Sequence, residues 1–219
     1  VVQLPAILAV VVYFWKDLWP FAAKREETVA RFVLWGKILL AFFPAVVLGA
    51  IFADMIEEKL FNPITVALAL LVGGILLIVL ERRSTTGAVP TARALTAGMA
   101  LMIGLFQCIA MIPGTSRSAA TIIGAMALGA SRLAAAEFSF FLAIPTMVGA
   151  TGYTIMKHGL NFTSEQWMVT AVGSVVAFGV AYAAIAGFMS YIRRNNFKPF
   201  GYYRIALGLI VLAYFLLIN

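Results

Sequence analysis

The sequence predicts an all-α polytopic membrane protein, because the composition is apolar, charge is sparse and the apolar segments are long. Of the 219 residues, 63% are hydrophobic and only 11% are charged, whereas soluble domains are about half apolar and a quarter charged. The mean hydropathy of +1.00 agrees with a lipid environment. The apolar segments are continuous rather than alternating, which favours membrane helices over the strands of a barrel.

Six apolar segments are expected to form membrane helices. A helix needs about 20 apolar residues to cross roughly 30 Å of hydrocarbon. Residues 1–15 are shorter, but Tyr13, Phe14 and Trp15 at their end are typical interfacial anchors, so we expect the remainder of a span there. The other five segments are 32–54, 63–80, 133–156, 167–189 and 202–218.

Residues 96–130 do not fit a simple span. The first apolar part, 96–112, has 17 residues and would be about 25 Å long as a helix, which is marginal for crossing. The second, 119–130, has 12 residues, or about 18 Å, and cannot cross. The polar break at 113–118 is too short for an ordinary loop. We therefore predict a re-entrant hairpin at about 96–130.

The distribution of Lys and Arg favours this hairpin, because these residues concentrate in cytoplasmic loops. If the hairpin returns to the side from which it enters, twelve basic residues lie on one side and two, Lys59 and Lys157, on the other. If 96–112 crosses fully, the split falls to eight against six. Lys37 and Arg117 remain at membrane depth, and Lys37 is expected to snorkel. The twelve are Lys16, Lys24, Arg25, Arg31, Arg82, Arg83, Arg93, Arg132, Arg193, Arg194, Lys198 and Arg204.

A weak internal similarity predicts inverted repeats. The sequences FNP at 61–63 and FKP at 197–199 each open a late helix. A hairpin followed by three spans in each half gives the two halves opposite orientations, as in many transporters. On this plan residues 1–219 form a single transmembrane domain. Residues 1–80 are the remainder of a first repeat whose N-terminal hairpin is missing, and residues 94–219 are the second repeat.

Composition also excludes several functional classes. The single cysteine, Cys108, cannot build a disulfide framework or a Cys-based metal site, and we expect no metal ligands in this chain. The net charge of +7 arises from short loops between apolar segments, which is typical of topology signals. We therefore expect the membrane, and not a nucleic acid, as the partner.

Arg117 is the strongest functional signal, because a guanidinium near the bilayer centre costs about 2.5 to 3.5 kcal/mol even on the lenient insertion scale. It should have an anionic partner, and Arg matches phosphate oxygens with two parallel hydrogen bonds. The neighbouring residues suit a phosphate through a flexible backbone, hydroxyl groups and the N–H groups of a helix N-terminus. These residues are Gly114, Thr115, Ser116, Ser118 and Thr121.

Two further polar residues are candidates for substrate binding. Glu137 lies about five residues into a span and could orient Arg117 or act on a proton, but it could equally snorkel at the cytoplasmic edge. An Arg117–Glu137 ion pair that only holds the hairpin together is the structural alternative. Gln107, one turn before Met111, could be a polar wall of the site or form an interhelical hydrogen bond.

Residues 113–121, PGTSRSAAT, resemble the P-G-x-S-R-S-x-x-T signature of the undecaprenyl-diphosphate phosphatases, or bacitracin-resistance family. The similarity extends through AEFSF at 136–140, AIP at 143–145, FPAVVLG at 43–49 and FNP at 61–63, and so covers essentially the whole chain. It implies a bacterial inner-membrane enzyme that removes the terminal phosphate of undecaprenyl diphosphate and recycles the lipid carrier of cell-wall synthesis. Ser116, Arg117 and Thr121 are then the active-site residues in this half.

The chain departs from the family in one respect. The family's E-x-x-x-E motif, serine-rich turn and histidine belong to the N-terminal hairpin, and Gln107 and Met111 cannot replace two carboxylates. On this resemblance part of the active site is missing, and a divalent cation such as Mg²⁺ would be held by residues absent from this chain. The implied partner is a long-chain isoprenyl diphosphate lipid. A homodimer is one possible oligomeric state, which the sequence leaves open.

A membrane transporter or lipid flippase with an anion-binding re-entrant loop is the alternative function. Broken helices that meet at the midplane in inverted repeats are shared with secondary transporters. Counter-ion-dependent uptake into liposomes would favour the transporter, and phosphate release from a long-chain isoprenyl diphosphate would favour the enzyme.

Overall fold

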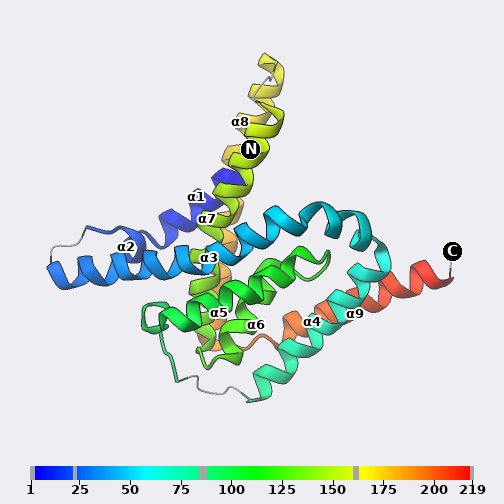
Figure 1. Cartoon of the computed structure of the whole chain (residues 1–219), viewed down its shortest axis with the longest axis horizontal. Helices are drawn as coiled ribbons and strands as arrows, with labels where there is room; N and C mark the ends of the chain where they lie inside the picture. Colours follow the sequence, from blue (N-terminus) through cyan, green and yellow to red (C-terminus); the bar gives the residue numbers. More distant parts are fainter. Residues whose placement is uncertain (1–2, 22–23, 84–87, 160–162, 218–219) are drawn as a thin grey trace.

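The computed structural model describes residues 3–21, 24–83, 88–159 and 163–217, and these parts are almost entirely helical (Figure 1). Within them no strand forms, apart from one isolated bridge between Val89 and Ala130. The helices are α1 (Gln3–Tyr13), α2 (Trp15–Leu18), α3 (Arg25–Leu60), α4 (Pro63–Arg83), α5 (Ala97–Cys108), α6 (Arg117–Ala127), α7 (Arg132–His158), α8 (Ser164–Arg194) and α9 (Lys198–Leu217), with 3₁₀ turns η1 (Ala92–Ala94) and η2 (Ile109–Met111).

Five of these helices are long and apolar enough to cross a membrane, which confirms the predicted fold class. Four of them contain the expected segments 32–54, 63–80, 133–156 and 167–189, and α9 contains the fifth as far as Leu217, since residue 218 lies outside the described residues. Helix α3 is the largest departure, because it has 36 residues and extends beyond the apolar segment at both ends. Glu26 and Glu27 in its first turn suit the positive end of the helix dipole. Its C-terminal extension ends at Leu60, shortly before Pro63, because a proline disfavours the helical conformation at the residue that precedes it.

Helices α5 and α6 form the short-armed hairpin that the sequence predicts. They have 12 and 11 residues and lie side by side beneath α3 (Figure 1). The arms approach closely, because a Cβ atom at Gly124 would lie 2.6 Å from the ring of Phe106. The Thr96 and Ser116 side chains cap the two arms by accepting hydrogen bonds from the N–H groups of Met99 and Ala119. The return of the hairpin to its own side, and the inverted repeat, stay predictions.

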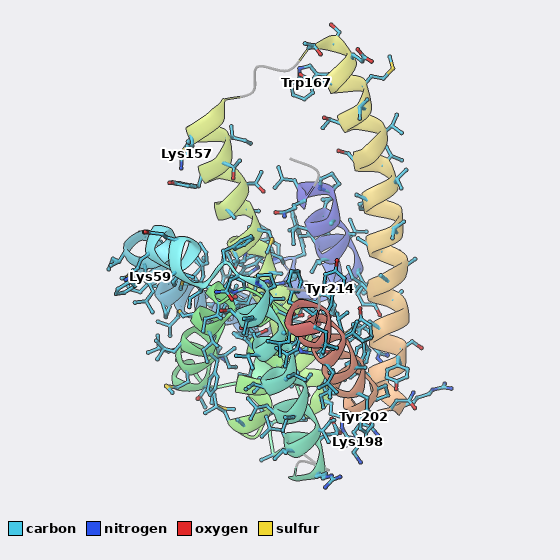
Figure 2. The ribbon with its side chains drawn as sticks, turned by 90° about the vertical axis from the view of Figure 1, so that its right-hand side faces the viewer. Lys59, Lys157, Trp167, Lys198, Tyr202 and Tyr214 are labelled. Carbon is cyan, nitrogen blue, oxygen red and sulfur yellow. The ribbon has the colours of Figure 1, made fainter. Side chains whose placement is uncertain are left out.

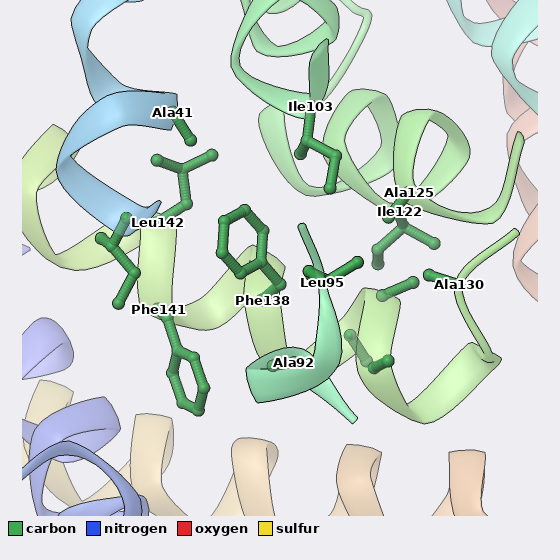
Figure 3. Packing of buried hydrophobic residues seen from close by; sticks show 14 of the residues in the cluster. Ala41, Ala92, Leu95, Ile103, Ile122, Ala125, Ala130, Phe138, Phe141 and Leu142 are labelled. Atoms are coloured by element: carbon green, nitrogen blue, oxygen red, sulfur yellow. The ribbon is translucent and has the colours of Figure 1, made fainter. Parts of the chain in front are cut away.

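The hydrophobic core lies around the first half of α7. Phe138 of α7 lies on the side of Ile103 of α5, whereas the ring of Phe141 points the other way and meets Phe14 after α1, with ring centroids 5.1 Å apart (Figure 3). The alanines at 134–136 are fully buried and let neighbouring elements approach α7. This core fixes the base of the hairpin against α7.

Outside this core the helices carry lipid-facing apolar side chains. Helix α8 is the clearest case, because Val172, Val175 and Val176 are all exposed. Lys157 and Trp167 mark one end of the α7–α8 pair, and Lys198 lies toward the other end of α8 (Figure 2). Helices α4 and α9 pack along each other as a second pair. This arrangement leaves the hairpin between the α4–α9 pair and α7.

Candidate functional site

The polar turn at 113–116 joins η2 to α6 and has an unusual backbone. Gly114 has a φ of 88° and Ser116 has a φ of 65°. Ser116 is the one non-glycine residue with a positive φ among the residues that the structure describes. Such conformations are costly and concentrate at functional sites. The turn therefore depends on contacts that hold it in this shape.

Arg117 is the first residue of α6 and points toward α7. One of its guanidinium nitrogens, Nη1, donates a hydrogen bond to the carbonyl oxygen of Ser139 at 3.2 Å. Within the described part of the chain Arg117 forms no ion pair, so the Arg117–Glu137 pair considered from the sequence does not occur. Glu137 instead accepts a hydrogen bond from the N–H of Ala92 in η1, at 3.4 Å. The guanidinium thus keeps donors available for an anion.

The serine hydroxyls on either side of Arg117 are exposed. The Oγ atoms of Ser116 and Ser118 lie 3.2 Å apart, and Ser116 Oγ also accepts a hydrogen bond from the N–H of Ala119. The first N–H groups of any α-helix lack an intrahelical partner and carry the positive end of the dipole. Two hydroxyls, the guanidinium of Arg117 and these N–H groups therefore gather at the start of α6.

Thr121 lies behind this group rather than in it. Its side chain is completely buried, and its Oγ1 is 2.7 Å from Oγ of Ser139 on α7. It is also within 3.0 and 3.1 Å of the carbonyl oxygens of Arg117 and Ser118. These contacts join the first turn of α6 to α7, so Thr121 is placed to position Arg117 and not to touch a phosphate.

Gly114 and Thr115 face the opposite side of the turn. A Cβ atom at Gly114 would lie 2.6 Å from the carbonyl oxygen of Val66, so glycine is required where the turn approaches α4. Both carbonyl oxygens accept hydrogen bonds from Nη2 of Arg204 on α9, at 3.1 and 2.9 Å. From the sequence Arg204 is expected among the basic residues of the cytoplasmic side. The structure places it within α9, buried against the hairpin, and the sequence does not predict this contact.

Gln107 is buried on α5 and faces α7. Its Oε1 is 3.5 Å from Oγ1 of Thr146, and its Nε2 has no partner among the described residues. The Thr146 hydroxyl has a single proton, which it donates to the carbonyl oxygen of Leu142 at 2.7 Å. Exchanging the amide N and O atoms of Gln107 would turn this contact into a donated hydrogen bond. Gln107 therefore makes the interhelical contact considered from the sequence, away from the serines of the turn.

A cavity of about 280 Å³ opens beside Arg117 between α6, α7 and α8. Arg117, Ser118 and Ser139 form its polar part, and the remaining wall is apolar. Among the described residues that line it there is no carboxylate, so the charge of Arg117 is uncompensated there. In the described ranges, no three His, Cys, Asp or Glu side chains lie close enough together to hold a metal ion.

Comparison with known proteins identifies the family. The family of bacitracin resistance protein BacA matches residues 1–210. The chain belongs to this family. It is 50% identical to undecaprenyl-diphosphatase 1 of Clostridioides difficile strain 630, with all of this chain and 80% of that protein covered. It is 51% identical to an undecaprenyl-diphosphatase of Lachnoclostridium phytofermentans (99% and 81% covered) and 48% identical to one of Pseudomonas putida W619 (97% and 77% covered).

In this BacA family member, the start of α6 presents several hydrogen-bond donors close together. A guanidinium, two serine hydroxyls and helix N-terminal N–H groups act in a partly desolvated place, where each electrostatic interaction is stronger than in water. These groups are all donors or can act as donors. The arrangement therefore suits a phosphate whose negative charge increases or shifts during a reaction.

Proposed function

We propose that this protein hydrolyses undecaprenyl diphosphate to undecaprenyl phosphate and inorganic phosphate in the bacterial inner membrane, and so recycles a lipid carrier of cell-wall synthesis. Membership of the BacA family and identities near 50% to proteins named undecaprenyl-diphosphatase support this. The observation that carries the proposal is the uncompensated guanidinium of Arg117 at the start of α6, beside a cavity in an apolar, membrane-spanning bundle.

In this proposal Arg117 binds the terminal phosphoryl group. Its guanidinium offers two parallel hydrogen bonds to the phosphoryl oxygens, and the N–H groups at the start of α6 and the hydroxyls of Ser116 and Ser118 bind the others. Hydrolysis breaks the bond between the terminal phosphorus and the bridging oxygen and transfers the phosphoryl group to water. Donors fixed before the reaction stabilise the charge that shifts during this transfer, which is the main contribution a protein makes to phosphoryl transfer.

The substrate also explains why the site belongs in a membrane. A long isoprenyl chain is apolar and stays in the hydrocarbon region, whereas its diphosphate requires polar partners. The hairpin places hydrogen-bond donors within an otherwise apolar bundle. The lipid-facing surfaces of α4 and α8 are apolar, so the isoprenyl tail can stay in the hydrocarbon region. We therefore propose that residues 96–130 are the part of the second repeat that binds the diphosphate head group of the substrate.

The test is phosphate release in detergent by the purified protein, produced with the N-terminal hairpin that the family resemblance implies. We expect inorganic phosphate from undecaprenyl diphosphate and much less from a water-soluble phosphomonoester of similar charge. Absence of release, together with counter-ion-dependent uptake of an anion into liposomes, would contradict the proposal and favour a transporter. The mass of the same preparation in detergent distinguishes a monomer from the homodimer, which stays a prediction.

A further inference from the structure

Arg204 makes an unusual set of contacts for a residue near the start of a membrane helix. It is the seventh residue of α9 and is only 8% exposed. Its Nη2 lies 2.9 Å from the carbonyl oxygen of Thr115, 3.1 Å from that of Gly114 and 3.2 Å from that of Ala69 on α4. A single nitrogen thus ties the polar turn to two helices that are distant in sequence.

The cost of burying this guanidinium indicates a function for it. A buried charge without a counter-charge is destabilising unless strong hydrogen bonds compensate it. Among the described residues Arg204 pairs with no carboxylate, and its Nε atom has no hydrogen-bond partner. The two hydrogens of Nη2 are shared by three carbonyl oxygens. The contacts that compensate the charge are those with the turn and with α4, so the charge is explained by what it does to the turn.

Planarity of the peptide group shows what that effect is. No cis peptide bond occurs in the described parts of the chain, so the N–H of Ser116 points opposite to the C=O of Thr115. Arg204 draws that C=O toward α4 and α9 and thereby directs the N–H of Ser116 to the other side of the turn. The same contact supports the positive φ of Ser116, which is costly without external support.

We propose that Arg204 is a positioning residue for the hydrolysis, which fixes the Thr115–Ser116 peptide so that the N–H of Ser116 donates to the phosphate bound by Arg117. This rests on the proposed function and adds to it. Arg204 itself does not touch the substrate. The two arginines have different tasks: Arg117 binds the phosphate directly, and Arg204 holds the backbone that binds it.

Helix α4 provides the space for this guanidinium through Gly73. A Cβ atom at Gly73 would lie 2.6 Å from Nη2 of Arg204 and 3.2 Å from its Cζ. These atoms are the end of a flexible side chain, so an alanine there would push the guanidinium off the carbonyl oxygens and leave the backbones of α4 and α9 in place. Gly73→Ala therefore perturbs the contact without removing the charge. Gly179→Ala on α8 is its control, because no side chain or neighbouring helix lies within 4 Å of that Cβ position.

The experiment measures kcat and KM for phosphate release from undecaprenyl diphosphate, per folded molecule eluting as a single peak in detergent. Arg204→Met should lower kcat about tenfold to a hundredfold, because a misplaced donor loses its effect in the transition state, while KM changes little. Arg204→Lys should retain roughly fivefold more kcat than Arg204→Met, because an ammonium offers three hydrogens from one point to three carbonyl oxygens. Arg194→Met, an exposed residue at the end of α8, is the control.

The outcomes separate this inference from the function on which it rests. If the unmodified protein releases no phosphate, the proposed function fails. If it does, and Arg204→Met lowers only the thermal midpoint while kcat per folded molecule stays unchanged, Arg204 is merely structural and the inference is overturned. If Arg204→Met does not fold, Gly73→Ala decides: a kcat lowered relative to Gly179→Ala supports positioning, and an unchanged kcat overturns it.

Discussion

Two arginines lie beside the turn before α6, and the sequence singles out only one of them. Arg117 follows the turn and points to α7, whereas Arg204 binds the carbonyl oxygens of the turn. Arg117 stands within a polar break between apolar segments, so hydropathy alone singles it out. Arg204 stands near the start of an apolar helix, where a cation usually snorkels to the interface. Its contacts lie 89 and 90 residues away in the chain, and no local spacing encodes them. A site residue of this kind becomes visible only when the packing of α4 against α9 is known.

Replacing Arg117 tests its direct role in binding the phosphate. Arg117→Ala should lower kcat for phosphate release about a hundredfold or more, the scale for losing a donor that stabilises transition-state charge. Arg117→Lys should restore little, because two parallel hydrogen bonds require the planar fork of a guanidinium. Exposed Arg194→Ala serves as the matched control. Near-normal turnover of the Arg117→Ala protein, measured at equal amounts of folded protein, would return this residue to a structural role.

Thr121 is predicted to act through packing rather than chemistry. Thr121→Val keeps the shape but leaves the hydroxyl of Ser139 without its 2.7 Å partner, which should cost about 1 to 3 kcal/mol of stability. The thermal midpoint in detergent should fall, and kcat per folded molecule should change less than in Arg117→Ala. Thr154→Val is the control, because that exposed hydroxyl bonds only its own helix. An unchanged midpoint with kcat lost a hundredfold would instead place the Thr121 hydroxyl in the reaction.

At the scale of elements, start and stop signals explain much of what the sequence predicts. Thr96, Ser116 and Ser131 each cap the helix that follows, and the polar break ends the first arm of the hairpin. The length of α3 was predicted too short, because hydropathy marks the apolar part of a helix and not its charged ends. The close packing of α5 on α3 could not be predicted, since it depends on glycines whose neighbours lie far away in the chain.

Gly104 provides a direct test of that close packing. A Cβ atom there would lie 2.2 Å from the carbonyl oxygen of Ala41, a backbone atom that cannot move aside. Gly104→Ala should therefore push α5 away from α3 and lower the thermal midpoint, with the roughly 1 to 3 kcal/mol cost typical of overpacking. Gly98→Ala on the same helix should be tolerated, because its nearest neighbour, Oγ1 of Thr96, lies at 3.9 Å. Equal midpoints for the two variants would contradict this packing.

At the scale of the whole molecule, buried ion pairing holds the helix ends together on one side. The carboxylate of Glu81, at the end of α4, pairs with Arg132 at the start of α7. It also accepts a hydrogen bond from the N–H of Phe197, between α8 and α9, at 3.1 Å. The sequence predicts that these ends share the basic, cytoplasmic side, and the contact agrees with it. Removing Arg204 from the cytoplasmic set leaves eleven basic residues against two, so the bias persists.

The last prediction is that the hairpin does not cross the membrane, so that the regions before α3 and after α8 lie on the same, cytoplasmic side. Helices α3, α4, α7 and α8 give an even number of crossings between Glu26 and Asn195. A fully crossing α5 would make that number odd and put the two residues on opposite sides. The basic loops on both sides of this stretch favour the even number.

Single cysteines in a Cys108→Ala background separate the two arrangements. Glu26→Cys and Asn195→Cys, both at exposed positions, should resist an impermeant thiol reagent added to intact cells and react once the membrane is opened. Ser164→Cys should react in intact cells, because the 31 residues of α8 carry its start to the opposite face from Asn195. Labelling of only one of the pair Glu26→Cys and Asn195→Cys would show that the hairpin crosses. Labelling of both with protection of Ser164→Cys would keep the hairpin and reverse the orientation, which would contradict the charge argument alone.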